Sequence, residues 1–192
     1  VMRQPLEDGV VTISRVSGSV VYPCNTMLVA SMNPCKCGHW GDPNKKCICT
    51  PTQRMRYMSR ISGPMMDRID IHLNVAQVKF DDMRSEKKGE SSAVIKERVN
   101  RAREIQLNRY KNEGIYSNSQ LSAPQIERYC EIDDDTSALL KSAFEKLGMS
   151  ARGYSRILKV SRTIADLEGA PDIKKEHVLQ AISFRSLDRE NI

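Results

Sequence analysis

The sequence predicts a chain of two parts, an α/β segment followed by an all-α domain. Short β-branched runs separated by turn residues fill the first 75 residues, whereas apolar residues recur at helical spacing through the last hundred. Between them, residues 81–91 are mostly charged and offer little to bury, which predicts a linker. The two domains are therefore expected at residues 1–80 and 92–192.

Three extended segments are expected in the first domain. The β-branched residues 10–16 can pair with residues 20–22 as a hairpin, because Ser17, Gly18 and Ser19 between them favour a turn. Residues 27–32 are a short continuous apolar run, which suits a buried parallel strand. Residues 69–75 alternate between apolar and polar side chains, as a half-buried strand does.

Helix start and stop signals define the rest. Thr50 opens a Thr-x-x-Gln capping box with Gln53, and Pro51 suits the first turn of that helix. In the second domain Ser150 and Asp172 can cap helices, and Gly148 can close one. The second domain is expected to contain helices near residues 92–112, 123–130, 136–147, 151–167 and 172–184.

The expected helix at 92–112 has two different faces. One face is apolar and contains Ile95, Val99, Ala102 and Ile105. The other face is basic and contains Lys96, Arg98, Arg101, Arg103 and Arg109. The basic face is one possible contact for a polyanion.

Composition limits the class of protein. The chain is 40% hydrophobic and 28% charged, which is typical of a globular protein. It contains neither an apolar run of the roughly 20 residues that a membrane helix needs nor a secretory signal at its start. A cytoplasmic protein without a membrane partner is expected. The net charge of +6 favours a polyanionic partner such as nucleic acid.

Four of the six cysteines lie within fifteen residues. Cys35, Cys37, Cys47 and Cys49 form two close pairs, and a short loop can bring such pairs into the tetrahedron that zinc prefers. The Cys-x-Cys spacing is tighter than the usual Cys-x-x-Cys, and four thiols without metal are the alternative. A site closed by four thiolates leaves no position for a reacting water, so a structural zinc ion is expected.

Five stretches in a fixed order resemble one family of ATPases. Residues 29–34 (VASMNP) resemble the AAA+ strand that ends in the sensor-1 asparagine, and residues 60–70 (RISGPMMDRID) resemble the arginine-finger segment of magnesium chelatases and MCM helicases. Residues 150–167 resemble the sensor-2 helix, residues 3–9 (RQPLEDG) the stretch after the Walker B strand, and residues 186–189 a typical ending. With its cysteine loop, the chain resembles the ComM/YifB branch of magnesium-chelatase-like AAA+ ATPases.

The resemblance implies a fold and a set of roles. The α/β segment corresponds to the C-terminal half of an AAA+ core, with its hairpin and zinc loop, and the helices correspond to the lid. Asn33 would orient the attacking water, Arg68 would be the arginine finger and Arg152 the sensor-2 arginine, with ATP and Mg²⁺ as cofactors. The rival for the finger is Arg60.

Each of these three residues also has a purely structural alternative. Asn33 before a proline suits a turn, and Arg152 suits an exposed helix end. Arg68 can form an ion pair with Asp67 or Asp70. The sequence alone leaves these alternatives open.

The nucleotide site implied by the resemblance is incomplete in this chain. None of its ten glycines precedes a lysine, so it contains no Gly-x-x-x-x-Gly-Lys-Ser/Thr phosphate loop. The chain starts at Val1 within what reads as a motif, so we expect a C-terminal fragment that does not hydrolyse ATP by itself.

The resemblance also implies a substrate. A hairpin before sensor 1 lines the central pore of MCM helicases, and Arg15 lies near the tip of the matching hairpin here. The leading hypothesis is a ring, expected to be a hexamer, that moves branched DNA during DNA uptake and recombination as a helicase. One alternative is a chelatase-type ATPase that remodels a protein partner, and another is an interaction module held together by zinc.

Overall fold

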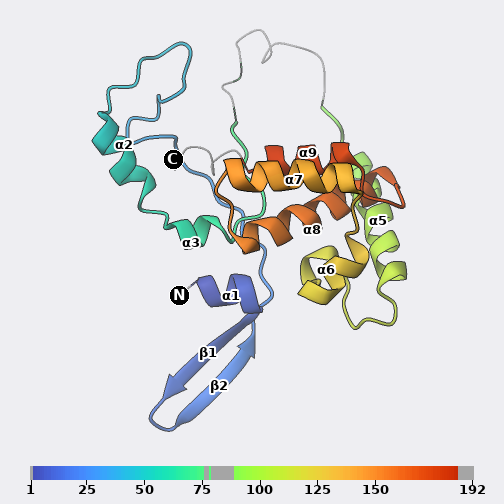
Figure 1. Cartoon of the computed structure of the whole chain (residues 1–192). Coiled ribbons are helices and arrows are strands. Elements are labelled where there is room, and N and C mark those ends of the chain that lie inside the picture. Colours follow the sequence, from blue (N-terminus) through green and yellow to red (C-terminus); the bar gives the residue numbers. More distant parts are fainter. Residues whose placement is uncertain (1, 76–77, 79–88, 186–192) are drawn as a thin grey trace. The chain divides into compact units, whose positions relative to one another are not determined.

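The structure is a computed structural model that describes residues 2–75, 78 and 89–185 (Figure 1). The chain forms two compact units, Val1–Ile69 and Asp70–Ile192. Most of the expected linker at 81–91 lies outside the described residues, and residues 89–91 form neither helix nor strand. No helix among the described residues has the length and apolar character needed to cross a membrane.

The first unit contains short helices and one hairpin. The two-stranded antiparallel sheet confirms the expected hairpin, but the turn expected at Ser17–Ser19 is wrong, because Gly18 and Ser19 pair as part of the second strand. Its turn is formed by Val16 and Ser17, and Arg15 at the end of the first strand pairs with Gly18 at the start of the second. The elements of this unit are α1 (Arg3–Asp8), β1 (Val10–Arg15), β2 (Gly18–Pro23), α2 (Pro51–Met58) and α3 (Gly63–Met66).

A glycine joins α1 to the hairpin. Gly9 ends α1 with a φ of +64°, in the left-handed region that favours glycine. A Cβ atom at this position would lie 2.6 Å from the side-chain oxygen of Asn25. The amide of Cys24 donates to the carbonyl of Gly9 at 2.7 Å, which ties the end of the hairpin to the end of α1.

The second helix begins where the capping box predicted. The amide of Gln53 donates to the hydroxyl of Thr50, and the amide of Thr50 donates back to the side chain of Gln53 at 3.0 Å. Pro51 is its first residue, where the missing amide hydrogen costs nothing. This local signal needed no distant partner, and the prediction is confirmed.

The two other predicted strands are wrong. Residues 27–32 and 69–75 carry no strand, and Met27 and Val29 are 89% and 83% exposed. A strand persists only when its backbone pairs with a neighbour, and the hairpin is the only sheet among the described residues. Apolar composition therefore predicted a strand for which the described residues provide no partner.

The second unit is helical, as predicted. It contains α5 (Ser92–Arg109), the 3₁₀ turn η1 (Asn118–Gln120), α6 (Ala123–Tyr129), α7 (Asp134–Lys146), α8 (Ala151–Glu168) and α9 (Lys175–Ser183) (Figure 1). Ser150 caps α8 by accepting from the amide of Gly153 at 3.1 Å. The last helix starts later than expected, at Lys175: the extended residue Lys174 is its N-cap, and Ile173 before it belongs to the buried core.

The core of this unit surrounds α8. Ile157, Leu158 and Ala165 on that helix are almost completely buried, and α8 packs against α5, α6 and α9. Residues from α6, α7 and α9, including Ile126, Leu140 and Val178, complete the same cluster. The burial of these apolar faces is the main stabilising contribution in this unit.

A buried carboxylate joins three segments inside this unit. Asp166 is 1% exposed and accepts from both guanidinium nitrogens of Arg109, at 3.0 and 2.5 Å. It also accepts from Arg162 at 3.1 Å and from the side-chain amide of Asn118 at 2.8 Å. Arg162 in turn donates to the carbonyls of Ala170 and Pro171. Because the buried charge is paired and hydrogen-bonded, it can be tolerated in the core.

Candidate metal centre and nucleotide-site residues

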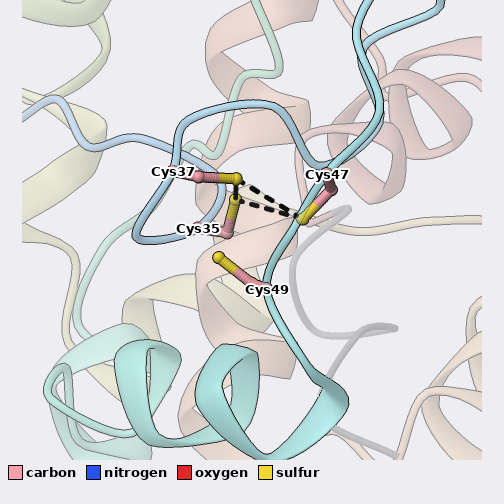
Figure 2. Close-up of side chains that lie close together, drawn as sticks. All are labelled: Cys35, Cys37, Cys47 and Cys49. Carbon is pink, nitrogen blue, oxygen red and sulfur yellow. Dashed lines mark hydrogen bonds between the residues drawn. The ribbon is translucent and has the colours of Figure 1, made fainter.

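Four cysteine sulfurs meet in the loop between residues 35 and 49 (Figure 2). All four sulfur atoms lie within 4.8 Å of one another. The Sγ atoms of Cys35 and Cys37 are 3.3 Å apart, and each is 3.6 Å from that of Cys47. Cys35 is fully buried and Cys49 is 9% exposed, whereas Cys37 and Cys47 are partly exposed.

These distances fit a tetrahedral metal site. Zinc–sulfur bonds of about 2.3 Å place the sulfurs of a regular tetrahedron about 3.8 Å apart. All four cysteines are free thiols, so each can provide a thiolate. A set of four soft sulfur ligands suits zinc rather than magnesium or calcium.

The protein environment already distinguishes the thiols. Backbone hydrogen bonds from His39, and then from Ile48, lower the pKa of Cys37 to about 6. Burial raises the pKa of Cys49 to about 11. The pKa of Cys35 is also lowered and that of Cys47 is also raised, so the four thiols fall into two pairs of opposite pKa shift.

An aromatic contact fixes the loop to the helix that follows it. The Arg54 guanidinium carbon lies 5.2 Å from the centre of the Trp40 ring, a cation–π arrangement. The same guanidinium donates to the carbonyl of Cys49 at 2.7 Å. The cysteine loop and α2 are therefore connected through the Arg54 side chain, whose contacts were not predicted from the sequence.

Asn33 lies close to this loop. It is exposed, and it lines a shallow hollow together with Ser31, Met32 and Tyr57. Its Cγ atom would be 4.0 Å from a Cβ atom at Gly38. The residue comes directly before the cysteine loop, but the strand expected to carry it is not formed.

Arg68 is held by its own unit. It pairs with the carboxylate of Glu7 and donates to the carbonyl of Pro64 at 2.5 Å, and its side chain is 11% exposed. The structure thus pairs Arg68 with Glu7, a residue on α1, while Asp70 pairs with Arg156. The sequence did not predict Glu7 as the partner of Arg68, although Glu7 lies within the RQPLEDG stretch that resembles the segment after the Walker B strand. The rival finger residue, Arg60, is exposed just after α2.

Arg152 lies in the first turn of α8, as expected, and is exposed. The next residue, Gly153, is buried; a Cβ there would lie 3.7 Å from both Met149 and the Ser150 hydroxyl. Arg152 belongs to the second unit, whereas Asn33 and Arg68 belong to the first.

The expected basic face of α5 is smaller than predicted. Arg98 forms a bidentate pair with Glu90, at 2.9 and 3.0 Å. Arg109 points into the unit and pairs with the buried Asp166. Helical spacing placed both arginines on one face, but their acidic partners could not be read from spacing. Lys96, Arg101 and Arg103 remain exposed.

The hairpin places Arg15 where the sequence predicted. It is the last residue of β1, next to the turn, and it is exposed. The turn residue Val16 is fully exposed. No aromatic side chain lies within the turn.

Both units match known protein families. The family model for the magnesium chelatase subunit ChlI matches residues 1–83, and that for the C-terminal region of this subunit matches residues 89–185. The chain therefore belongs to the magnesium-chelatase-like family.

Within that family the chain is similar to ComM and YifB proteins. It is 40% identical over 189 residues to competence protein ComM of Haemophilus influenzae, covering 98% of this chain and 36% of that protein. It is 39% identical to YifB of Salmonella typhimurium and 37% identical to YifB of Escherichia coli, with the same coverage. The chain thus spans about a third of the length of these relatives.

Proposed function

We propose that this chain is part of an AAA+ ATPase that acts on DNA during uptake and recombination. The observation that carries the proposal is the family match across both units, together with the similarity to a competence protein. Because the chain spans 36% of that relative, the proposed activity is that of a longer protein. We propose a ring of subunits, a hexamer, working in the cytoplasm.

In this proposal three residues act on the nucleotide. Asn33 orients the attacking water, Arg152 contacts the γ-phosphate from the lid, and Arg68 stabilises charge on the phosphoryl group of a neighbouring subunit. ATP with Mg²⁺ supplies the phosphoryl group and its counter-charge. The 192 residues contain no phosphate loop of the Gly-Lys-Ser/Thr type, so we propose that the chain alone does not hydrolyse ATP.

The pair between Arg68 and Glu7 constrains this role. A finger arginine must present its guanidinium to a phosphate, whereas here a carboxylate of the same unit occupies it. The side chain would therefore exchange Glu7 for phosphate when a neighbouring subunit approaches. A charge-assisted bond of this kind can keep the guanidinium extended and positioned until then.

The cysteine cluster is proposed to hold zinc in a structural role. Cys35, Cys37, Cys47 and Cys49 would be its four ligands, and a bound zinc ion would cross-link the two ends of the loop. No catalytic step is assigned to it, because four thiolates complete the coordination shell.

A chelatase-type ATPase that remodels a protein partner is the second candidate. The observation in its favour is that both matching family models describe a magnesium chelatase subunit. Fluorescence anisotropy with forked DNA, using the full-length protein and ATP, separates the two functions. Saturable binding that weakens when Arg15 is replaced by alanine supports the DNA motor, whereas absent binding supports the chelatase type.

The finger role has its own test in the full-length protein. Arg68→Ala should retain ATP binding and lose hydrolysis, because the finger acts in the transition state. Mixing this variant with a phosphate-loop variant should restore part of the activity if the finger acts across a subunit boundary. No recovery in subunits that are shown to exchange would move the role to Arg60 or place it within one subunit.

A further inference from the structure

Nearly all the net positive charge of the chain comes from one segment of the first unit. Residues 26–66 contain six basic side chains and a single acidic one, a net charge of +5 out of +6 for the whole chain. The basic residues are Lys36, Lys45, Lys46, Arg54, Arg56 and Arg60. Elsewhere positive and negative side chains nearly balance, so this segment dominates the field that a polyanion would encounter.

The one acidic residue does not offset this charge at the surface. The side chain of Asp42 is only 4% exposed. Its carboxylate accepts the amides of Asn44 and Lys45 at 2.8 and 3.2 Å, which closes the turn of the loop. The carboxylate is therefore used inside the loop, and the surface of the loop presents mainly positive charge.

The three lysines among these basic residues lie on the small loop that contains the cysteine cluster. Lys36 lies between Cys35 and Cys37, and Lys46 directly precedes Cys47. Because the sulfurs of these cysteines are 3.3–3.6 Å apart, the two ends of the loop are held side by side. Lys36, Lys45 and Lys46 are all exposed, and we name them the loop lysines.

An aromatic ring accompanies the loop lysines. Trp40 lies in the same loop, remains 36% exposed and is fixed by Arg54 in a cation–π contact. Its position needs little reordering on binding, because Arg54 is also anchored to the Cys49 carbonyl. A partly exposed indole in the same loop as several exposed cations is the combination with which proteins hold unpaired bases and their phosphates.

We infer that the cysteine loop is a binding site for single-stranded DNA, in which the loop lysines contact phosphates and Trp40 stacks on a base. The inference deepens the proposed function and rests on its DNA substrate, but it places DNA on the cysteine loop in addition to the hairpin. The paired arginines of α5 strengthen the assignment, because Arg98 and Arg109 are occupied by carboxylates.

The test uses the 192-residue chain, a fluorescein-labelled dT20 strand and no ATP. The variant K36Q/K45Q/K46Q removes the loop lysines, and K96Q/R101Q/R103Q removes the same charge from the exposed face of α5. Since each phosphate contact on a single strand contributes about 0.7 to the log–log salt slope, the loop variant should flatten the slope by about 2 units. The α5 variant should leave the slope close to that of the wild type.

Trp40 provides a second readout, because it is the only tryptophan of the chain. Bound dT20 should quench its fluorescence, and W40A should weaken binding while keeping the salt slope. Circular dichroism of the two charge variants should match the wild type, since the replaced cations are exposed. Absent binding by the wild type at low salt, or equal losses in the two charge variants, would overturn the inference. The inference would also be overturned if an acidic peptide, at the same concentration of negative charge, displaced dT20, because the site would then recognise charge and not DNA.

The outcome is separable from that of the proposed function. If the loop variant binds normally while the full-length protein still unwinds DNA with ATP, the inference fails and the motor stands. If the chain binds dT20 through the loop lysines but the full-length protein shows no ATP-driven activity on DNA, the site stands and the motor fails.

Discussion

In the unit of residues 70–192, fourteen apolar side chains form one buried cluster around α8. In the unit of residues 1–69, the buried apolar side chains among the described residues are Cys35, Cys49 and Met66. The second unit is thus held by burial of apolar faces, which typically supplies most of the folding free energy. The first unit has little such burial but contains the four convergent sulfurs, so we predict that metal binding contributes more to the stability of the first unit than to that of the second.

The largest effect is expected from removal of the metal ligands. Cys49→Ser removes one of the four thiolate ligands and should reduce bound zinc from about one per chain to near zero. Because structural zinc contributes on the order of 10 kcal/mol to small domains, the first unit should lose much of its stability. Hydrogen exchange should then accelerate across the loop and α2, while α8 keeps its protection. Elemental analysis and exchange mass spectrometry provide the measurements.

The matched control for this change is Cys24→Ser. Cys24 belongs to the same unit but lies outside the four-sulfur cluster. It should retain full zinc content. If the wild-type protein is purified without chelator and contains four free thiols but no zinc, the first unit is not stabilised by a metal ion.

The next largest effect concerns the buried carboxylate of the second unit. Asp166→Ala leaves Arg109 and Arg162 without their shared partner and should cost about 3–5 kcal/mol of unfolding free energy. Asp172→Ala is the control, since Asp172 is exposed and its loss should change stability by no more than about 0.5 kcal/mol. Urea unfolding followed by circular dichroism measures both, and equal stabilities would mean that the network contributes little.

Apolar truncations should differ between the two units. Leu140 is 1% exposed, and Leu140→Ala should cost ~3 kcal/mol through lost burial and a residual cavity. Val29 in the first unit is 83% exposed, so Val29→Ala should change stability by less than about 0.5 kcal/mol. If Val29→Ala proves equally destabilising in urea titrations of the chain, that residue is buried in solution.

The smallest effect is a pH dependence at one helix start. Asp133 caps α7 by accepting from the backbone amide of Thr136 at 2.7 Å, and the proximity of the Thr136 side chain and this amide bond lower the pKa of Asp133. A carboxyl with a lowered folded pKa stabilises the protein above its unfolded pKa, and this contribution is lost as pH falls through the folded pKa. The stability difference between wild type and Asp133→Asn should therefore narrow upon acidification from pH 7.

The neutral cap of the first unit provides the contrast. Thr50 has no charge to lose, so the difference between wild type and Thr50→Ala should stay constant through the range in which Asp133 titrates. Thermal unfolding between pH 7 and pH 3 follows both differences. A Thr50→Ala difference that narrows in the same way would assign the effect to general acid destabilisation.

Local signals predicted α2 and the helices of the second unit, because each signal acts within a few residues; the cap expected at Asp172 is wrong, since Lys174 is the N-cap of α9. The caps at Thr50 and Ser150 both form the predicted hydrogen bonds. The hairpin was predicted for the same reason, since its strands are joined by a short turn. The run at 27–32 failed because a strand also needs a partner, which composition does not reveal.

In the candidate site, too, contacts between residues close in the sequence were predicted and contacts between distant residues were not. Close spacing was enough to predict that the four cysteines meet. The partners of Arg68 and Arg109 were missed, because Glu7 and Asp166 lie 61 and 57 residues away along the chain. Helical spacing assigned Arg109 to a surface, whereas a buried carboxylate on another helix determines where it points.

The measurement that tests the central claim most directly is unwinding of a forked DNA duplex by the full-length protein. We predict strand separation that requires ATP and is abolished by Arg68→Ala. Arg15→Ala should reduce strand separation without changing the DNA-free ATPase activity. The proposed DNA motor would be contradicted if the full-length protein hydrolysed ATP without binding or unwinding forked DNA, and if this hydrolysis did not depend on Arg68.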